Sequence, residues 1–358
     1  MVIGDNLIVG GGKLIFNAPD TFGPGDADDL FIRTATLVLG VNGALTNQMD
    51  DLNISSETAG GGILDLNGTT GSSSTDIIIG LNPANYGTAP ALAGNIIDSV
   101  GGGSFSTTTL TFRNGTISGN VSATTTVAIG SQIAADDGGV NITAGNVSGN
   151  LTVGTTFTII EGNLSGNVTF GSTFTKHSRG TVTLSGNNVG GTGITTINAG
   201  TVILDHTVNA GLKIGGAGLT MNGGLLQIKG NASTPVNVAP GNLVLGSATD
   251  PASVILKIDT AGAATTLSLG TITRNVGATL RFNPSTTLGH LTTSATSLGG
   301  WATYQLGSGP AQIRDGRRRR SRRHHEHGVG QRRRLARRRQ HYRRERLHRY
   351  VGDDAQDQ

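Results

Sequence analysis

The chain has 358 residues, 57 glycines, no cysteine and only 4% aromatic residues. This length exceeds one ordinary globular core, which stops growing near about 250–300 residues, whereas units of a repeat array pack only on their neighbours. The lack of cysteine excludes disulfides and thiolate metal sites. The net charge of +4 is the sum of two parts of opposite sign. Residues 1–313 carry a net charge of −7, and residues 314–358 carry a net charge of +11. We therefore predict a repeat region over 1–313 and a separate tail over 314–358.

Short runs of alternating apolar residues recur along the repeat region. Each has three to six residues with period 2, which is typical of half-buried strands, and Gly, Asn and Ser separate them. Examples are 36–40, 63–68, 109–112, 181–186, 201–205, 225–229, 243–246, 254–259, 267–270 and 279–283. No stretch of ten or more residues combines helical periodicity with good helix formers. The pattern predicts an all-β fold.

One motif repeats. Ser-Gly-Asn follows Ile117, Val147, Leu164 and Leu184 at offsets of 30, 17 and 20 residues, and a further step of 20 leads to Leu204. Self-similarity near 20 residues indicates a solenoid rather than a sandwich. Each coil would advance the axis by one strand spacing, ~4.8 Å, so that inward Val, Ile and Leu stack on their equivalents.

The asparagines of this motif allow two interpretations. Asn120, Asn150, Asn167 and Asn187 fall at matching turn positions. Stacked coils would let their side-chain amides form a ladder along the axis. Alternatively, Asn is present because it tolerates turn conformations.

Residues 180–205 read Gly-Thr-Val-Thr-Leu-Ser-Gly-Asn-Asn-Val-Gly-Gly-Thr-Gly-Ile-Thr-Thr-Ile-Asn-Ala-Gly-Thr-Val-Ile-Leu-Asp. This segment resembles the autotransporter-associated β-strand repeat, in which a strand, Ser-Gly-Asn, a Gly-Thr-rich turn and Thr-Ile-Asn-Ala-Gly-Thr precede a second strand. Weaker echoes lie at 60–68, and segments 272–282 and 298–304 look like parts of very large repeat proteins of this type. The resemblance implies a right-handed parallel β-helix passenger, exported and displayed at the outer membrane.

The chain departs from that family at both ends. The family's C-terminal translocating barrel needs many alternating strands of ~10 residues, and none is present. The segment from Met1 to Asn6 shows no signal peptide, and no run approaches the ~20 apolar residues of a membrane-spanning helix. We expect that the signal is missing from this chain through truncation, and that the barrel was lost with it or that this relative is anchored differently.

Acidic clusters are the first candidates for chemistry, because β-helices can host polysaccharide lyases and hydrolases. They are Asp26/Asp28/Asp29, Asp50/Asp51 and Asp136/Asp137. Hydrolysis needs two carboxylates about 5–9.5 Å apart, and a lyase would need a Ca²⁺ cage with a basic residue. In these Gly-rich contexts we favour solvated turns. Calcium at Asp26–Asp29 is a lesser alternative, and the Gly-Gly-x-Gly-x-Asp motif is met at neither 60–62 nor 101–103.

Other polar residues form no catalytic pattern. His177, His206 and His290 are isolated, and Asp205 precedes His206 directly, which in a strand sends the two side chains to opposite faces. No Gly-x-Ser-x-Gly elbow stands out, and the glycine triplets lack the Lys-Ser/Thr of a phosphate loop. Trp301 would either stack on a sugar ring or close a terminal coil, and we favour the coil. We predict no catalytic, cofactor-binding or metal-binding residues.

The tail has two interpretations. Residues 314–358 contain 17 Arg and no Lys, in runs such as 316–325 and 331–340. Such runs would bind phosphate backbones or anionic glycans through counterion release and be disordered until bound. The interpretation we favour is that the tail is out of frame or non-native, because all-Arg usage fits GC-rich codons read in a shifted frame.

Together these features predict a non-enzymatic structural or adhesive passenger-type protein, exported to the bacterial cell surface, without cofactors and as a monomer. Expected partners are host or environmental glycans or surface proteins, with outer-membrane association through a segment absent here. A small-molecule substrate is not expected, nor is nucleic acid. The alternatives are a β-helix polysaccharide lyase or hydrolase, and binding of nucleic acid or a heparin-like polymer by the Arg-rich tail.

Overall fold

The computed structural model describes residues 7–19, 29–46, 51–54, 61–73, 75–80, 93–129, 145–187, 193–247, 249, 251–295 and 298–309. The chain divides into two compact units, one of residues 1–296 with 301–312 and one of residues 297–300 with 313–358. The first unit contains all the described strands. The tail predicted over 314–358, with its expected disorder, lies outside the described residues.

Two sheets make up the first unit. The first sheet has sixteen strands: β1 (Leu7–Val9), β3 (Leu30–Ile32), β5 (Asp51–Ile54), β7 (Thr70–Ser72), β8 (Asp76–Ile79), β10 (Ser104–Phe112), β12 (Asn120–Ile129), β14 (Leu151–Val153), β15 (Thr156–Ile159), β17 (Val168–Phe170), β18 (Thr173–Lys176), β20 (Thr195–Ile197), β22 (Leu219–Met221), β24 (Val236–Leu245), β26 (Thr265–Arg274) and β28 (Gly289–Thr293).

The second sheet has thirteen strands: β2 (Lys13–Phe16), β4 (Thr36–Leu39), β6 (Ile63–Asp65), β9 (Gly94–Ile97), β11 (Gly115–Ile117), β13 (Gly145–Val147), β16 (Gly162–Leu164), β19 (Thr181–Leu184), β21 (Thr201–Asp205), β23 (Gly224–Lys229), β25 (Ser253–Asp259), β27 (Thr279–Pro284) and β29 (Ala302–Tyr304). In the described part of the chain, the one helical element is the 3-10 turn η2 (Gly299–Trp301).

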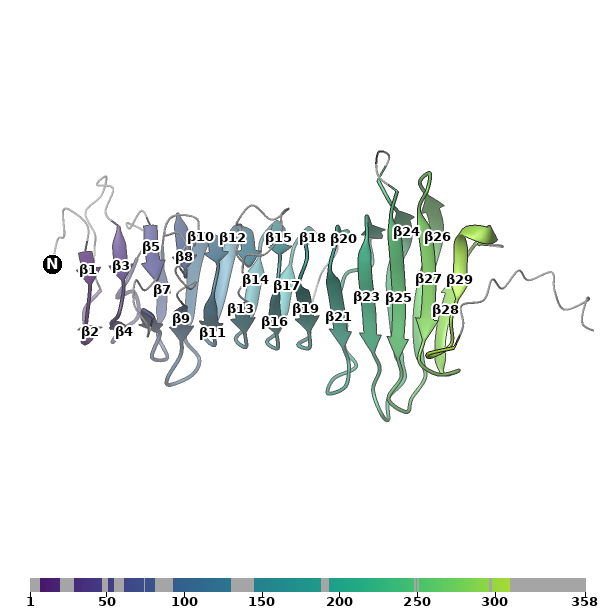
Figure 1. Cartoon of the computed structure of the whole chain (residues 1–358). Coiled ribbons are helices and arrows are strands. Elements are labelled where there is room, and N and C mark those ends of the chain that lie inside the picture. The colour runs from purple at the N-terminus through teal and green to yellow at the C-terminus, as the bar shows by residue number, and fades with distance from the viewer. Residues whose placement is uncertain are drawn as a thin grey trace, which may run out of the picture. The chain divides into compact units, whose positions relative to one another are not determined.

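The chain alternates between the two sheets, and each strand pairs in parallel with strands of the coils before and after it. Figure 1 shows the coils of this unit following one another in chain order along a single stacking direction. This is a parallel β-helix, so the predicted all-β solenoid is confirmed. Each of the ten predicted runs contributes to a strand.

The Ser-Gly-Asn repeat sets the register of the central coils. Ile117 pairs with Val147, Val147 with Leu164, Leu164 with Leu184 and Leu184 with Leu204. The uneven offsets of 30, 17, 20 and 20 residues are therefore the lengths of successive coils. Insertions lengthen the turns and leave the strand register unchanged.

A third, shorter face appears in the central coils. Strands β7, β14 and β17 lie off the main path of the first sheet and extend it with the first halves of β10 and β12. In β10 the register shifts between Thr107 and Thr109, which separates the two halves of the strand. These coils thus have three short strands joined by corners.

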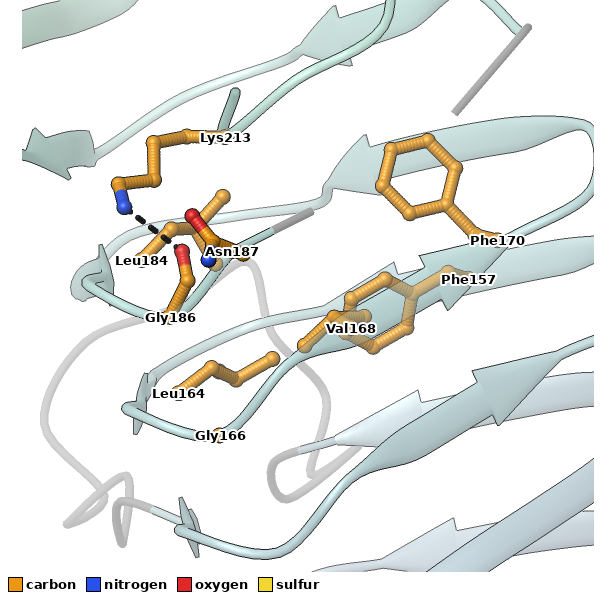
Figure 2. Close-up of a pocket in the computed structure, with 9 residues that line it drawn as sticks. All are labelled: Phe157, Leu164, Gly166, Val168, Phe170, Leu184, Gly186, Asn187 and Lys213. Carbon is orange, nitrogen blue, oxygen red and sulfur yellow. Dashed lines mark hydrogen bonds between the residues drawn. The ribbon is translucent and has the colours of Figure 1, made fainter. Parts of the chain in front are cut away.

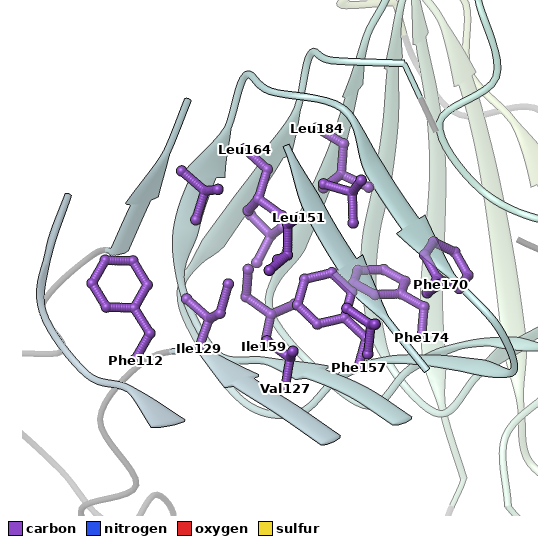
Figure 3. Close-up of a cluster of buried hydrophobic side chains, with 14 of the residues drawn as sticks. Phe112, Val127, Ile129, Leu151, Phe157, Ile159, Leu164, Phe170, Phe174 and Leu184 are labelled. Atoms are coloured by element: carbon purple, nitrogen blue, oxygen red, sulfur yellow. The ribbon is translucent and has the colours of Figure 1, made fainter. Parts of the chain in front are cut away.

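Inward side chains form one continuous core. Phe157 and Phe174 pair in register with ring centroids 5.3 Å apart, and Phe170 lies 5.9 Å from Phe174. Figure 3 shows this group continuing through Ile159 of the same strand as Phe157 and Ile129 of the preceding coil. Full burial of one such side chain contributes roughly 1.5–3 kcal/mol. Each coil depends on its neighbours for this burial.

Glycine occupies the corners because the backbones of successive coils meet there. A Cβ atom built on Gly149 would overlap the carbonyl oxygen of Gly119, one on Gly166 that of Gly149, and one on Gly186 that of Gly166. Only a residue without a side chain fits such a contact. The glycine of the repeated Ser-Gly-Asn motif is therefore required by the stacking of the coils, not by local turn conformation alone.

The asparagines at these corners bond along the stack, although not as a continuous amide ladder. The backbone N–H of Asn150 donates to Oδ1 of Asn120 at 3.2 Å, and that of Asn187 donates to Oδ1 of Asn167 at 3.1 Å. These contacts join a side chain to the backbone of the next coil. Asn120 and Asn167 therefore act as acceptors for the backbone of the neighbouring coil, an arrangement that neither interpretation predicted.

Replacing Gly166 with Ala tests the corner packing. The added methyl group would force the Gly149 carbonyl away, and overpacking of this kind costs about 1–3 kcal/mol. The free energy of unfolding from urea denaturation should fall accordingly. Gly11→Ala is the matched control, because a Cβ atom there has nothing within 4 Å. Equal stability of the two variants would contradict this account of the corners.

Candidate functional site

Four strands of the first sheet carry the same outward pattern. Residues 109–112, 126–129, 156–159 and 173–176 read Thr-Leu-Thr-Phe, Thr-Val-Ala-Ile, Thr-Phe-Thr-Ile and Thr-Phe-Thr-Lys. In each, the first and third side chains are partly exposed and the second and fourth are buried. Because successive side chains of a strand point to opposite faces, the threonines lie on the outer surface.

The strand register aligns these threonines in two columns. In one column Thr109 pairs with Thr126, Thr126 with Thr156, and Thr156 with Thr173. The members are adjacent in four successive coils, so their spacing along the stack is that of parallel strands.

The second column lies two residues further along each strand. Thr111 pairs with Ala128, Ala128 with Thr158, and Thr158 with Thr175. The column continues over two more coils, where Thr175 pairs with Thr196 and Thr196 with Thr220. It therefore spans six successive coils with a single interruption at Ala128.

We call these nine residues the threonine face: Thr109, Thr111, Thr126, Thr156, Thr158, Thr173, Thr175, Thr196 and Thr220. All nine side chains are partly exposed. Among the contacts of the described residues, none of the nine hydroxyl groups donates or accepts a hydrogen bond. The hydroxyls are thus available to bind something outside the protein.

The core directly beneath holds the face in place. Leu110, Val127, Phe157 and Phe174 alternate with the threonines and are almost completely buried. Threonine is itself stiff, because its branched Cβ restricts the side-chain rotamer. The hydroxyl and methyl groups are therefore preorganised.

The other outer faces are less regular. On the short third face a single hydroxyl column runs through Ser106, Ser122, Thr152 and Thr169. On the second sheet the outward positions mix Asn and Thr with other residues in later coils. Two adjacent columns of one residue type distinguish the threonine face.

The alternation at 109–112 predicts a strand, but it does not reveal this face. The signal was present as Thr-x-Thr at 109–111, 156–158 and 173–175. Those segments are separated by unequal numbers of residues, however, and only the strand register shows that they align.

The acidic clusters are mostly outside the described residues. Asp26, Asp28, Asp50, Asp136 and Asp137 are not described, whereas Asp29 and Asp51 are. Asp51 lies on β5 opposite Asp76 of β8, and the hydroxyl of Thr75 donates to its Oδ1 at 3.4 Å. The described structure thus places Asp51 beside a carboxylate of the next coil. No group of three or more His, Asp or Glu side chains suited to a metal occurs among the described residues.

Of the three histidines considered above, one is buried. His177 and His290 are exposed and lie apart, on the turn after β18 and on β28. His206 has a 2% exposed surface and follows β21, and neither of its ring nitrogens has a hydrogen-bond partner among the described residues. Burial, and then the positive charge of Lys213, lower its pKa from 6.5 to about 4.

Lys213 contacts the carbonyl oxygens at the last of the stacked Ser-Gly-Asn corners. Its Nζ donates to the carbonyl oxygens of Ser185 and Gly186 at 2.9 and 2.8 Å and to Oδ1 of Asn209 at 3.1 Å. In earlier coils the corner carbonyl lies against the glycine of the next Ser-Gly-Asn motif, and here the ammonium group takes that place. Burial lowers the pKa of Lys213 from 10.5 to about 8, and the negative charge of Asp205 opposes the shift.

A small pocket lies beside this lysine. Its lining is mainly apolar and includes Phe157, Phe170 and Leu184, and Figure 2 shows the bond from Lys213 to Gly186 at one side. The centre of a water molecule has about 10 Å³ in which to move, which is room for roughly one water. The pocket is too small for a sugar or a nucleotide.

The glycine triplet at 101–103 donates backbone hydrogen bonds to a carboxylate of the protein itself, that of Asp98. Asp98 Oδ1 accepts hydrogen bonds from the N–H groups of Gly68 and Gly101 at 2.7 and 3.0 Å, and Oδ2 accepts one from Gly103 at 2.6 Å. Burial opposes ionisation, but the backbone hydrogen bonds prevail and lower the pKa of Asp98. The carboxylate thus already accepts hydrogen bonds from the backbone N–H groups that a phosphate would need.

Trp301 packs at the end of the stack. It is partly buried against the core, and the guanidinium of Arg274 lies 5.6 Å from its ring centroid. This placement fits the closing of a terminal coil.

No helix in the described part of the chain is long and apolar enough to cross a membrane. Comparisons with protein-family models, curated proteins and solved structures found no match.

The buried His206 predicts a pH dependence of stability. Its folded-state pKa of about 4 lies below the unfolded value of 6.5, so the unfolded chain binds the extra proton as the pH falls. His206 should therefore lower the free energy of unfolding progressively from pH 6.5 to 4, with no further loss from this group below that range. Urea denaturation at pH 7 and pH 5 measures the slope.

His206→Leu should flatten this slope, and His177→Leu is the control because the ring of His177 is exposed. The explanation fails if both variants keep the slope of the original chain.

Proposed function

We propose that this chain is a non-enzymatic structural or adhesive repeat protein of the bacterial cell surface, similar to an autotransporter passenger. The resemblance centred on residues 180–205 supports the proposal. Its two strand segments form β19 and β21, which pair in register from Thr181 with Thr201 to Leu184 with Leu204. The repeat-like segment therefore corresponds to one complete coil of the β-helix.

The observation that carries the adhesive role is the threonine face. A surface of repeated, unbonded hydroxyl groups on a rigid support offers many identical weak contacts. Binding through such contacts depends on the number engaged together, since each further contact forms within an already tethered complex. This suits attachment to an extended surface better than capture of one small molecule.

The absence of catalytic function is also part of the proposal. The described pocket accommodates roughly one water, and the charged residue that lines it, Lys213, donates hydrogen bonds to the carbonyl oxygens of Ser185 and Gly186. Asp51 and Asp76 are partly exposed neighbours on β5 and β8. Polysaccharide cleavage would require a second group to protonate the leaving sugar in a defined site.

We further propose display outside the cell as a monomer, with glycans or surface proteins of a host or the environment as partners. Anchoring at the outer membrane would use a segment other than the residues described. The Arg-rich tail, with its proposed binding of anionic polymers, is not needed for this role.

Surface display is tested in the source bacterium with antibodies raised against the full chain. We expect antibody labelling of intact cells, and loss of the labelled protein when protease is added outside the cells. A periplasmic marker protein should survive the same treatment. Labelling only after the cells are broken would overturn the proposed localisation.

The non-enzymatic role is tested by incubating the full chain with pectin and alginate. No reducing or unsaturated ends should appear, and Asp51→Asn with Asp76→Asn should leave the result unchanged. Product release that disappears in this double variant would assign catalysis to the pair and overturn the non-enzymatic role.

A further inference from the structure

The threonine face is periodic in two directions. Along the stack, threonines of neighbouring coils repeat at the spacing of parallel strands, ~4.8 Å. Along each strand, Thr156 and Thr158, or Thr173 and Thr175, are two residues apart, which corresponds to roughly 6.6 Å. The register pairs place both columns over the same four coils, interrupted only by Ala128. The result is a nearly rectangular grid of hydroxyl and methyl groups.

A ligand that uses the whole grid must itself repeat in two dimensions. Only an ordered lattice presents hydroxyl-sized acceptors and donors at fixed intervals in both directions. The prism face of hexagonal ice presents water oxygens in a rectangular array whose two repeats are close to those of the grid. We propose that the threonine face binds the surface of an ice crystal.

The chemistry of the face fits this ligand. No charged side chain lies among the nine threonines, although Asp76 borders the first column in register with Thr109. The nine hydroxyls have no hydrogen-bond partner among the described residues. Water in the lattice offers both donors and acceptors, so a hydroxyl in either orientation finds a partner. The neighbouring methyl groups displace liquid water without requiring hydrogen bonds.

A dissolved polysaccharide fits less well. Recognition of a sugar ring commonly uses an aromatic side chain for stacking, and the grid contains none. A flexible polymer also loses conformational freedom when it is immobilised, whereas a crystal is already ordered. The backing core, including Phe157 and Phe174, holds the protein side equally rigid.

The inference rests on the same threonine face as the proposed adhesive role, but it does not depend on the proposed cell-surface location, because the grid belongs to the folded chain. Ice binding by the purified protein and surface display in the bacterium are separate measurements. Either proposal can fail while the other stands.

The test uses the purified full chain and ice grown slowly on a cooled probe in dilute protein solution. We expect the protein to be enriched in the ice fraction, and single ice crystals grown in its presence to become faceted. Bovine serum albumin in the same solution should be excluded from the ice.

The variant Thr158→Lys with Thr175→Lys places two charged side chains in the middle of the grid. Incorporation into ice should then fall to that of albumin. The matched control is Thr152→Lys with Thr169→Lys, because this pair is also in register, faces outward and lies in the same two coils on the third face. The control should bind ice like the original chain.

A second pair, Thr158→Val with Thr175→Val, keeps the branched shape required in the strand and removes only the hydroxyls. Ice incorporation should decrease while circular dichroism and the thermal midpoint stay unchanged. The proposal is overturned if the original chain is excluded from ice, if the control pair loses binding as strongly as the grid pair, or if the Val pair binds fully. Binding to microcrystalline cellulose or chitin that depends on Thr158 and Thr175, without ice binding, would also overturn it.

Discussion

The hydrogen bonds between successive coils fix their separation at ~4.8 Å, and the rest of the molecule must fit that distance. At the corners the backbones meet so closely that Gly149 and Gly166 leave no room for a side chain. Inside, the same spacing brings Phe157 onto Phe174, so that apolar groups are buried only by their neighbours along the stack. Outside, it aligns equivalent threonines. Core, corners and surface thus follow from a single repeat distance.

One interruption of the repeat places an ammonium group beside the corner carbonyls. The coil that follows Leu184 and Gly186 lacks a further Ser-Gly-Asn, and the ammonium group of Lys213 donates to the corner carbonyls instead. His206 is buried in the same segment with its ring nitrogens unpaired among the described residues, and burial depresses its pKa. This segment joins the regular central coils to the longer strands that follow. A break in sequence regularity therefore coincides with the burial of a histidine whose pKa is lowered.

The outer surface has a regular part, the threonine face, and irregular parts. A solvated β-helix needs only polar outward residues, and the mixed Asn, Thr and Lys positions of the second sheet satisfy that need. Two neighbouring columns of Thr over the same coils are more regular than solubility alone requires. Their rigid support by Leu110 and Phe174 makes them a surface that can match an ordered partner. This arrangement connects the proposed adhesive role with the proposed ligand.

The sequence by itself determined the all-β class and the solenoid, because alternation within each run and the repetition of Ser-Gly-Asn are local patterns. It also determined the register of four central coils, since the offsets between Ile117, Val147, Leu164 and Leu184 are the pairings observed. The tertiary structure alone decided which outward residues become neighbours. Coils of unequal length place Thr126 and Thr156 side by side across an insertion, and period-2 patterns within a strand contain no information about that alignment. The sequence also does not reveal the carbonyl partners of Lys213, because they lie 27 and 28 residues away in a preceding coil.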